Sequence, residues 1–131
     1  MKIEFQHVHK RFNDTVVLKD VQDSIEFESL AVLGPSGSGK STLLRLLAGL
    51  IPLDEGLILI DSKAIPTTEA ELIHYRQSMG FVFQSNGLFP HLSALENITL
   101  ALTQVHKKEA EDAKSRALQY LEKFGLSAQA H

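Results

Sequence analysis

The sequence predicts an α/β fold in which a buried strand leads into a glycine-rich loop and an amphipathic helix leads out of it. Three observations favour this fold. Residues 30–33 form a continuous apolar run, as expected for a strand covered on both faces. Glycines recur directly afterwards, between residues 34 and 39. From Lys40 to Leu50, leucines then follow a helical spacing that produces one broad apolar face.

The segment before the loop is predicted to form antiparallel strands. Lys2–Val8 alternates polar and apolar residues, which is typical of a half-buried strand. Asn13–Asp14 is a turn signal, and the short run Val16–Leu18 is expected to pair back as a hairpin. A further apolar run, Ile25–Phe27, favours more strand in this region.

The segment after the loop predicts two more strands and a helix. Leu57–Ile60 has the composition of a strand. Thr68–Glu71 has the form of a capping box, which predicts a helix through about Gln77. Gly80–Phe83 is a second candidate for a short buried strand.

The C-terminal segment predicts two helices. Ser93–Glu96 is another capping box, followed by apolar residues at helical spacing through Val105. The last helix is expected from about Lys107 to Phe124, with Gly125 as its C-terminal stop.

The composition excludes several classes of function. The net charge of −3 offers no general attraction to nucleic acid, so any anion site must be local and no nucleic-acid partner is expected. The sequence contains no cysteine, which excludes disulfides, thiolate metal sites and cysteine nucleophiles. No apolar run is long enough to cross a bilayer. The chain is therefore expected in the cytoplasm, with any membrane contact made through a partner.

The residues Gly34–Ser41, GPSGSGKS, fit the phosphate-loop pattern G-x-x-x-x-G-K-[ST]. Glycines let the backbone curve so that successive N–H groups face one centre, and the following helix adds unpaired N–H groups with a partial positive charge. A glycine-rich turn that precedes a helix by chance is the plainer alternative. The predicted strand before the loop and helix after it favour the phosphate-binding interpretation.

This interpretation predicts a site for a nucleoside triphosphate, Mg²⁺-ATP in first place. Lys40 reaches the β- and γ-phosphates, the Ser41 hydroxyl ligates Mg²⁺, and Thr42 donates to the α-phosphate. The residues predicted to contact the phosphates are Gly34, Ser36, Gly37, Ser38, Gly39, Lys40, Ser41 and Thr42.

The loop and the segments around it resemble the ATPase subunits of ABC transporters. The similarity includes PSGSGKSTLL at residues 35–44 and LAGL at residues 47–50. It continues with GFVFQ at residues 80–84, which resembles the Q-loop strand of that family, and LFPHLSALEN at residues 88–97. The later segments are most similar to importers of polar amino acids.

This resemblance implies a fold and further site residues. The fold is that of a truncated P-loop NTPase of the ABC type, with an N-terminal antiparallel β part and an ATP-binding core in residues 1–90 and the start of a helical subdomain in residues 91–131. Phe12 matches the aromatic residue on which adenine stacks, with Val17 beside it; a capping role in the hairpin is the alternative for Phe12. Gln84 matches the glutamine that contacts Mg²⁺ and the attacking water, although a glutamine after an apolar strand is commonly only a surface residue.

Several family motifs are missing from the printed sequence. After Gln84 there is no Leu-Ser-Gly-Gly-Gln run, no apolar strand ending in Asp-Glu, and no switch histidine, so no complete catalytic set is predicted. Hydrolysis needs a positioned water as well as a phosphate site. The chain is therefore expected to bind ATP and to hydrolyse it poorly. Without the partner strands of the missing half, residues 30–33 are expected to expose apolar surface. Ser62 stands where the family hairpin normally has glycine.

Three hypotheses follow for the function. In the first, the chain is the ATP-binding portion of an ABC ATPase that energises import, in the first instance of polar amino acids. Its partners would be a second ATPase subunit, including by exchange of a segment, and a membrane permease that holds it at the inner face of the membrane. In the second, it is a non-catalytic nucleotide-binding fragment that self-associates. An unrelated P-loop kinase or GTPase is a third hypothesis. The absence of an Asn-Lys-x-Asp run disfavours the GTPase, and the resemblance of residues 80–84 to the Q-loop disfavours both.

Overall fold

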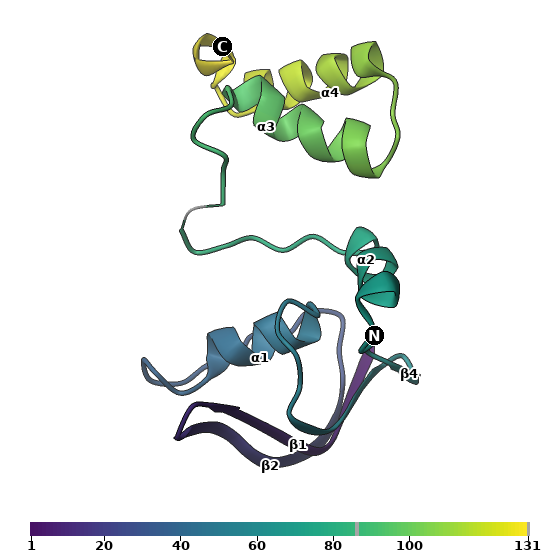
Figure 1. The fold of residues 1–131 in the computed structure, drawn as a ribbon. Helices are drawn as coiled ribbons and strands as arrows, with labels where there is room; N and C mark the ends of the chain where they lie inside the picture. The colour runs from purple at the N-terminus through teal and green to yellow at the C-terminus, as the bar shows by residue number, and fades with distance from the viewer. Residues whose placement is uncertain (86, 131) are drawn as a thin grey trace. The chain divides into compact units, whose positions relative to one another are not determined.

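A computed structural model describes residues 1–85 and 87–130 of the chain (Figure 1). The chain divides into two compact units, Met1–Gly80 and Phe81–His131, and each unit is described by itself. The described residues follow the predicted order: an antiparallel sheet, the loop with its helix, and a following helical part. The predicted domain division at residues 90 and 91 stays a prediction.

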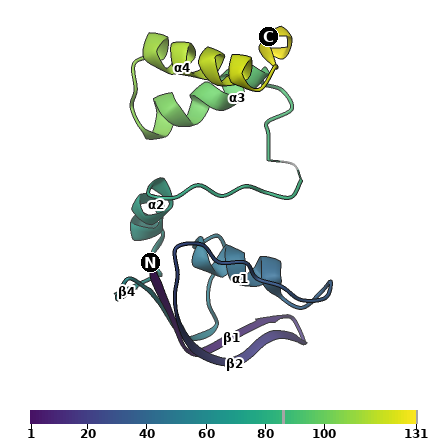
Figure 2. The same cartoon turned by 180° about the vertical axis from the view of Figure 1, so that it is seen from behind.

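The first unit is built on a four-stranded antiparallel sheet (Figure 2). Its strands follow the order β2-β1-β3-β4. Their bounds are Lys2–Phe12 for β1, Thr15–Glu26 for β2, Glu55–Ile60 for β3 and Lys63–Ala64 for β4. The predicted hairpin is confirmed: β1 and β2 pair from Lys2 with Glu26 to Phe12 with Thr15, around the turn at Asn13–Asp14.

A small hydrophobic core joins this sheet to the helix that follows the loop. The helix α1 spans Lys40–Leu47 and contributes Leu46 to the core. The sheet contributes Ile3, Phe5 and Val8 of β1 and Ile58 of β3. The predicted alternation holds from Ile3 to Phe5, and a bulge between Phe5 and Val8 then shifts its phase, so that Val8 also lies in the core.

Two side chains attach the next helix to the C-terminal end of α1. The helix α2 spans Glu69–Gln77. The Arg76 guanidinium donates from Nε (3.0 Å) and Nη2 (2.6 Å) to the carbonyl oxygen of Gly49, and the Tyr75 hydroxyl donates to Leu47 O. These donors satisfy carbonyl groups that a helix leaves unpaired at its end. Half of the predicted capping box forms at the start of α2. The Thr68 hydroxyl oxygen accepts from the Glu71 amide, as predicted. The Glu71 carboxylate accepts from the Thr68 hydroxyl, whereas a full capping box requires a bond from the Thr68 amide.

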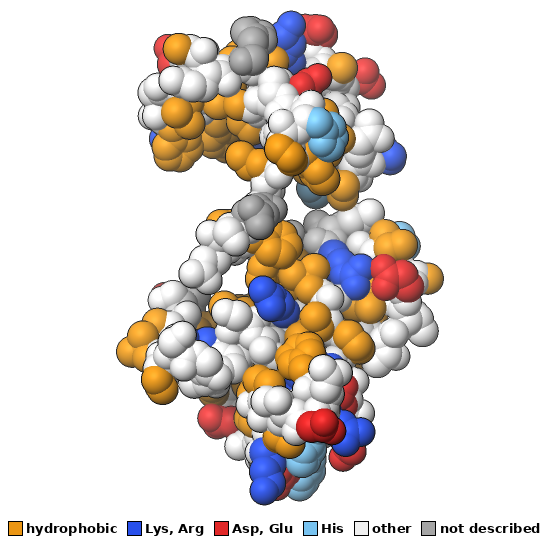
Figure 3. All heavy atoms as spheres, turned by 60° about the vertical axis from the view of Figure 1, so that its left-hand side comes forward, with side chains coloured by type: hydrophobic (Ala, Val, Ile, Leu, Met, Phe, Trp, Pro, Cys, Tyr) orange, Lys and Arg blue, Asp and Glu red, His pale blue; other side chains and the backbone are white. Residues whose placement is uncertain are grey.

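Two predicted buried strands do not form. Residues 30–33 and 80–83 are outside the sheet, and they include two of the most exposed apolar residues that the structure describes: Leu33 is 90% exposed and Val82 is 95% exposed. Figure 3 shows one face of the molecule, on which many hydrophobic side chains reach the surface. The physical reason is that a strand requires a neighbour for its N–H and C=O groups. No strand of residues 1–85 and 87–130 pairs with either segment. The apolar run of residues 30–33 is therefore exposed, which was the expectation without partner strands.

The second unit contains two helices that pack on each other. The helix α3 spans Ala94–Leu100 and continues as the π-helical segment Ala101–Val105, labelled η1; α4 spans Ala110–Lys123 and is followed by the short helix η2, Ser127–Gln129. The predicted capping box of α3 is confirmed: the Ser93 amide donates to Glu96 Oε2 (2.7 Å) and the Glu96 amide to Ser93 Oγ (3.2 Å). No helix in the described parts of the chain has the length and apolar composition needed to cross a bilayer.

The last helix begins later than predicted and ends where predicted. Lys107 has a φ of 53°, so the helical backbone cannot run through it, and α4 starts at Ala110. Its buried side chains are spaced four residues apart, at Ala113, Ala117 and Leu121. Gly125 has a φ of 69° and its amide bonds back to Glu122 O at 2.9 Å, which is the expected glycine stop.

The turn between β3 and β4 contains a strained residue that can be tested. Ser62 has a φ of 66°, a left-handed conformation that costs a non-glycine residue about 1 kcal/mol. We expect Ser62→Gly to raise the free energy of unfolding by about 1 kcal/mol because glycine adopts this conformation without strain. Urea unfolding followed by circular dichroism measures the change.

Ser78→Gly is the matched control. Ser78 is the C-cap of α2 with a φ of −86°, and its hydroxyl donates to Tyr75 O at 2.7 Å. Here glycine relieves no strain and removes a hydrogen bond, so the free energy of unfolding should fall by about 1 kcal/mol in this variant. Changes of the same sign in the two variants would contradict the account.

Candidate phosphate-binding loop

The glycine-rich loop forms a tight turn directly before α1. Gly37 and Gly39 have φ values of 80° and 87°, in the left-handed region that glycine adopts without strain. Gly39 is the N-cap of α1. A small cavity of about 270 Å³ lies against the loop, lined by Leu18, Val32, Leu33, Gly34, Pro35, Ser38, Gly39, Lys40 and Leu43. Of the predicted phosphate contacts, Gly34, Ser38, Gly39 and Lys40 therefore line one concavity at the helix start. The other four predicted contacts do not line it: Ser36, Gly37, Ser41 and Thr42.

The helix start supplies backbone donors. The Leu43 amide donates to Gly39 O at 2.9 Å, which is the first bond of the helical pattern. The amides of Lys40, Ser41 and Thr42 precede that bond, and amides in the first turn of a helix have no partner within the helix. The first turn of α1 contains no acidic residue that would cancel the positive end of the helix. This end of α1 is therefore suited to an anion.

The Lys40 side chain folds back over its own loop. Its ammonium nitrogen Nζ lies 2.9 Å from Gly34 O, 2.6 Å from Pro35 O and 3.4 Å from Ser38 Oγ. The Ser38 amide also donates to Pro35 O, at 3.3 Å. Three oxygen atoms of the loop thus lie around a single, partly exposed positive charge. An arriving phosphate would replace the carbonyl oxygens as the partner of this ammonium, with a stronger, charge-assisted bond.

A β-bulge brings Val17 against the end of the loop. Lys10 pairs with Leu18 and Arg11 with Val16, so Val17 has no partner across the ladder. A methyl group added at Gly39 would lie 3.0 Å from Val17 Cγ1 and 3.4 Å from Val17 O. The predicted neighbour of the nucleotide is therefore in contact with the phosphate loop.

Phe12 lies next to the turn of the same hairpin, on the strand opposite Val17. It is the last residue of β1, paired with Thr15, and its side chain is 45% exposed. The Lys10 ammonium lies over the ring, 5.2 Å from its centre. Both roles considered for Phe12 remain compatible with this position, and adenine stacking stays a prediction.

The pair formed by Lys10 and Asp54 was not found from the sequence. Lys10 Nζ lies 2.7 Å from Asp54 Oδ1, and the Arg11 amide donates to Asp54 Oδ2 at 2.7 Å. The hydrogen bond from Lys10, and then that from Arg11, hold the pKa of the Asp54 carboxyl below its ordinary value. The only available signal was that Lys10 continues the inward side of the first strand, where lysine is rare. Its partner lies 44 residues further along the chain.

Gln84 lies in the second unit, whereas Ser41 lies in the first. The predicted joint contact of these two residues with Mg²⁺ therefore stays a prediction. Among residues 1–85 and 87–130, no group of three or more His, Cys, Asp or Glu side chains has a geometry that could hold a metal ion.

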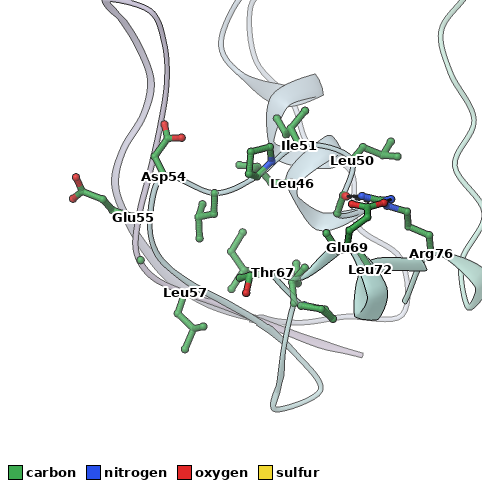
Figure 4. Close-up of a pocket in the computed structure, with 17 residues that line it drawn as sticks. Leu46, Leu50, Ile51, Asp54, Glu55, Leu57, Thr67, Glu69, Leu72 and Arg76 are labelled. Carbon is green, nitrogen blue, oxygen red and sulfur yellow. Dashed lines mark hydrogen bonds and ion pairs between the residues drawn. The ribbon is translucent and has the colours of Figure 1, made fainter. Parts of the chain in front are cut away.

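A larger cavity lies at the opposite end of α1 (Figure 4). It has a volume of about 550 Å³ and is lined mainly by apolar side chains, among them Leu46, Leu50, Ile51, Leu57 and Leu72. It contains none of the predicted phosphate-binding residues. The larger volume of this cavity does not make it the nucleotide site, because phosphate binding requires backbone amides and a positive charge, which the loop supplies.

Comparison with known proteins supports a single family. A sequence model described as "ABC transporter" matches residues 18–131. The glutamine transport ATP-binding protein GlnQ of Bacillus subtilis strain 168 is 42% identical over 125 residues, which cover 95% of this chain and 52% of GlnQ. The glutamate/aspartate import ATP-binding protein GltL of Escherichia coli K12 is 41% identical over 130 residues, covering 98% of this chain and 54% of GltL.

A solved structure agrees with these sequence comparisons. MJ0796, a bacterial ABC transporter cassette determined as a dimer, superposes with a TM-score of 0.80 at 35% identity. The match covers 92% of this chain and 56% of the MJ0796 chain. The present chain therefore spans about half the length of the relatives that it matches.

The contact between Gly39 and Val17 gives a first test of the site geometry. Gly37→Ala and Gly39→Ala both place alanine at a positive φ, at a cost of about 1 kcal/mol. Only Gly39→Ala also drives a methyl group into Val17, because the space at Gly37 is open to 4 Å. We expect Gly39→Ala to be less stable than Gly37→Ala by about 1–2 kcal/mol in urea unfolding. Val17→Ala in the Gly39→Ala background should recover part of the loss, and equal losses at the two glycines would refute the contact.

The lowered pKa of Asp54 gives a second test. A carboxyl group with a depressed pKa in the folded state stabilises the fold at neutral pH and loses this contribution as the pH falls through that pKa, below about pH 4. Asp54→Asn should therefore be less stable than the wild type at pH 7, and the difference should shrink towards pH 3. Chemical unfolding at a series of pH values measures it, with Glu55→Gln at the exposed neighbouring position as the control. A difference that does not change with pH would contradict the assignment.

Proposed function

We propose that this chain, which belongs to the ABC transporter family, binds Mg²⁺-ATP on the loop Gly34–Ser41 as the nucleotide-binding half of an ATPase that energises amino-acid import. One observation carries the proposal: loop oxygens lie around the Lys40 ammonium, 2.9 Å from Gly34 O and 2.6 Å from Pro35 O, at the N-terminus of α1. This arrangement combines a positive charge, backbone donors and a helix end, which together favour a polyphosphate.

Each residue of the site has a defined role in this proposal. Lys40 exchanges its carbonyl partners for β- and γ-phosphate oxygens, and the Thr42 hydroxyl donates to the α-phosphate. The Ser41 hydroxyl, exposed on the first turn of α1, and the Gln84 amide oxygen are the oxygen donors that would hold Mg²⁺, which neutralises phosphate charge when bound. Phe12 stacks on the base, with Val17 beside the loop.

The transported substrate and the partners follow from the relatives' names. GlnQ is a glutamine transport protein and GltL a glutamate/aspartate import protein, so a polar amino acid is the proposed substrate. Import requires a membrane permease, which is the proposed partner and would hold the chain at the cytoplasmic face of the membrane. Because MJ0796 forms a dimer, a second ATPase subunit is the other proposed partner.

A second candidate is a nucleotide-binding chain that associates with a further copy of itself and does not hydrolyse ATP. The specific observation in its favour is the exposure of Leu33 and Val82 in segments that pair with no strand of residues 1–85 and 87–130, since unpaired backbone is a template for strand pairing between chains. Light scattering tests this candidate: a monomer at tens of micromolar protein would count against self-association.

Calorimetry tests the proposed function. We expect Mg²⁺-ATP to bind the wild-type chain and Lys40→Ala to lower the affinity roughly ten- to hundred-fold, because a charge-assisted hydrogen bond to phosphate is lost. Lys63→Ala, which removes an exposed lysine of β4, should bind like the wild type and controls for net charge.

Turnover by the isolated chain is expected at background, since the printed sequence contains no complete set of hydrolytic residues. Equal affinity of Lys40→Ala and the wild type would overturn the proposal for the loop. Rapid hydrolysis by the chain alone would overturn the proposal that it is only the nucleotide-binding half.

A further inference from the structure

Lys10 is a buried cation within the sheet. Only 5% of the residue is exposed, and it lies on the inward side of β1, beyond the fully buried Val8. Lysine is almost never buried unless it is paired, because its ammonium group loses hydration. Lys10 therefore requires a structural or functional reason, and the roles assigned above to the phosphate loop do not provide one.

Asp54 pairs with Lys10 and fixes it to the end of β1. Its two carboxylate oxygens are each used: Oδ1 accepts from Lys10 Nζ at 2.7 Å and Oδ2 from the Arg11 amide at 2.7 Å. The Asp54 amide in turn donates to His9 O at 3.4 Å. Three successive residues of β1 are thereby held by one aspartate, which leaves the ammonium group little freedom to move.

The ammonium group is directed at the Phe12 ring. Lys10 and Phe12 are two residues apart on one strand, so their side chains lie on the same side of the sheet. Lys10 Nζ lies 5.2 Å from the ring centre, within the range of a cation–π interaction. The ring is nevertheless 45% exposed. A cation thus occupies one part of the ring surface while another part remains accessible to a ligand.

The hairpin also places Phe12 at a suitable distance from the phosphate loop. Thr15, the cross-strand partner of Phe12, is two residues from Val17, which corresponds to about 7 Å along a strand. Val17 in turn contacts the loop at Gly39. A nucleotide with its phosphates on the loop can therefore bring its base towards Phe12 through the ribose.

We propose that Lys10, held by Asp54, is a positioning residue that orients the Phe12 ring for stacking with a purine base. The proposal rests on the proposed function, because it requires phosphates on the loop. Lys10 itself does not contact the nucleotide. It fixes the ring from one side, so that the base meets a ring already held in place, and preorganisation of this kind increases affinity.

The test compares two ligands that share phosphates and differ in the base. Mg²⁺-ATP engages both the loop and the ring, whereas Mg²⁺-tripolyphosphate engages the loop alone. Lys10→Gln keeps a hydrogen-bond donor to Asp54 but removes the charge. We expect it to lower the affinity for Mg²⁺-ATP about five-fold and to leave the affinity for Mg²⁺-tripolyphosphate unchanged. Lys10→Arg keeps the cation and should bind ATP within about two-fold of the wild type. Lys63→Gln is the control for charge.

A second readout does not depend on the folding of a Lys10 variant. The chain has no tryptophan, so the emission of Phe12→Trp reports on that position alone. ATP should change this emission and tripolyphosphate should not.

A double variant tests whether Lys10 acts through the ring. In the Phe12→Leu background, Lys10→Gln should have no further effect on ATP affinity, because the ring on which Lys10 acts is gone.

The outcomes separate this inference from the proposed function. An equal loss of affinity for both ligands in Lys10→Gln would mean that Lys10 only supports the fold. Unchanged affinity for both ligands would mean that Lys10 has no role in binding. Either result overturns this inference and leaves the proposed function intact. A wild-type chain that binds neither ligand overturns the proposed function and the inference with it. No ATP-dependent change in Phe12→Trp emission would overturn the inference even if tripolyphosphate binds.

Discussion

The contact of the Lys40 ammonium with its own loop is the interaction on which the account of this chain depends. The positive φ values at Gly37 and Gly39 turn the backbone around the ammonium, and two carbonyl oxygens hold it in place. The same turn starts α1 at Lys40, so the N-terminal end of the helix and the Lys40 side chain both line the small cavity. In the proposed function, these positive groups would hold an anion although the chain as a whole has a charge of −3.

The hairpin contacts the chain both before and after α1, which explains why the hairpin and the loop form one unit. At the N-terminal end, the bulged Val17 packs on Gly39. After the C-terminal end, Asp54 pairs with Lys10 of β1. The strand β1 is therefore linked to the segments on either side of the helix. A base on Phe12 and phosphates on the loop would thus be bound by elements whose relative positions are already fixed, so little ordering would be needed on binding.

Local patterns predicted much of this fold. The first hairpin, α1, β3 and the capping box at Ser93 each depend on residues close in sequence, and each is present. The strands at 30–33 and 80–83 were wrong because strand formation requires a neighbouring strand, which an apolar run alone does not guarantee. The pair of Lys10 and Asp54 could not be predicted, since a bulge in β1 and a loop 44 residues away create it together. The glycine turn and the helix start were predicted from spacing and are present, whereas the binding roles of the loop residues, Phe12 and Gln84 stay predictions.

The central claim is that the loop amides and the Lys40 ammonium face one anion site. The most direct measurement is a two-dimensional ¹H–¹⁵N NMR titration with Mg²⁺-ATP. The account predicts that the backbone amides of Gly37, Gly39, Lys40 and Ser41 show the largest shifts, and that tripolyphosphate shifts the same set. Shifts concentrated around the apolar cavity near Leu50 and Leu72, or no saturable shift in the loop, would contradict it.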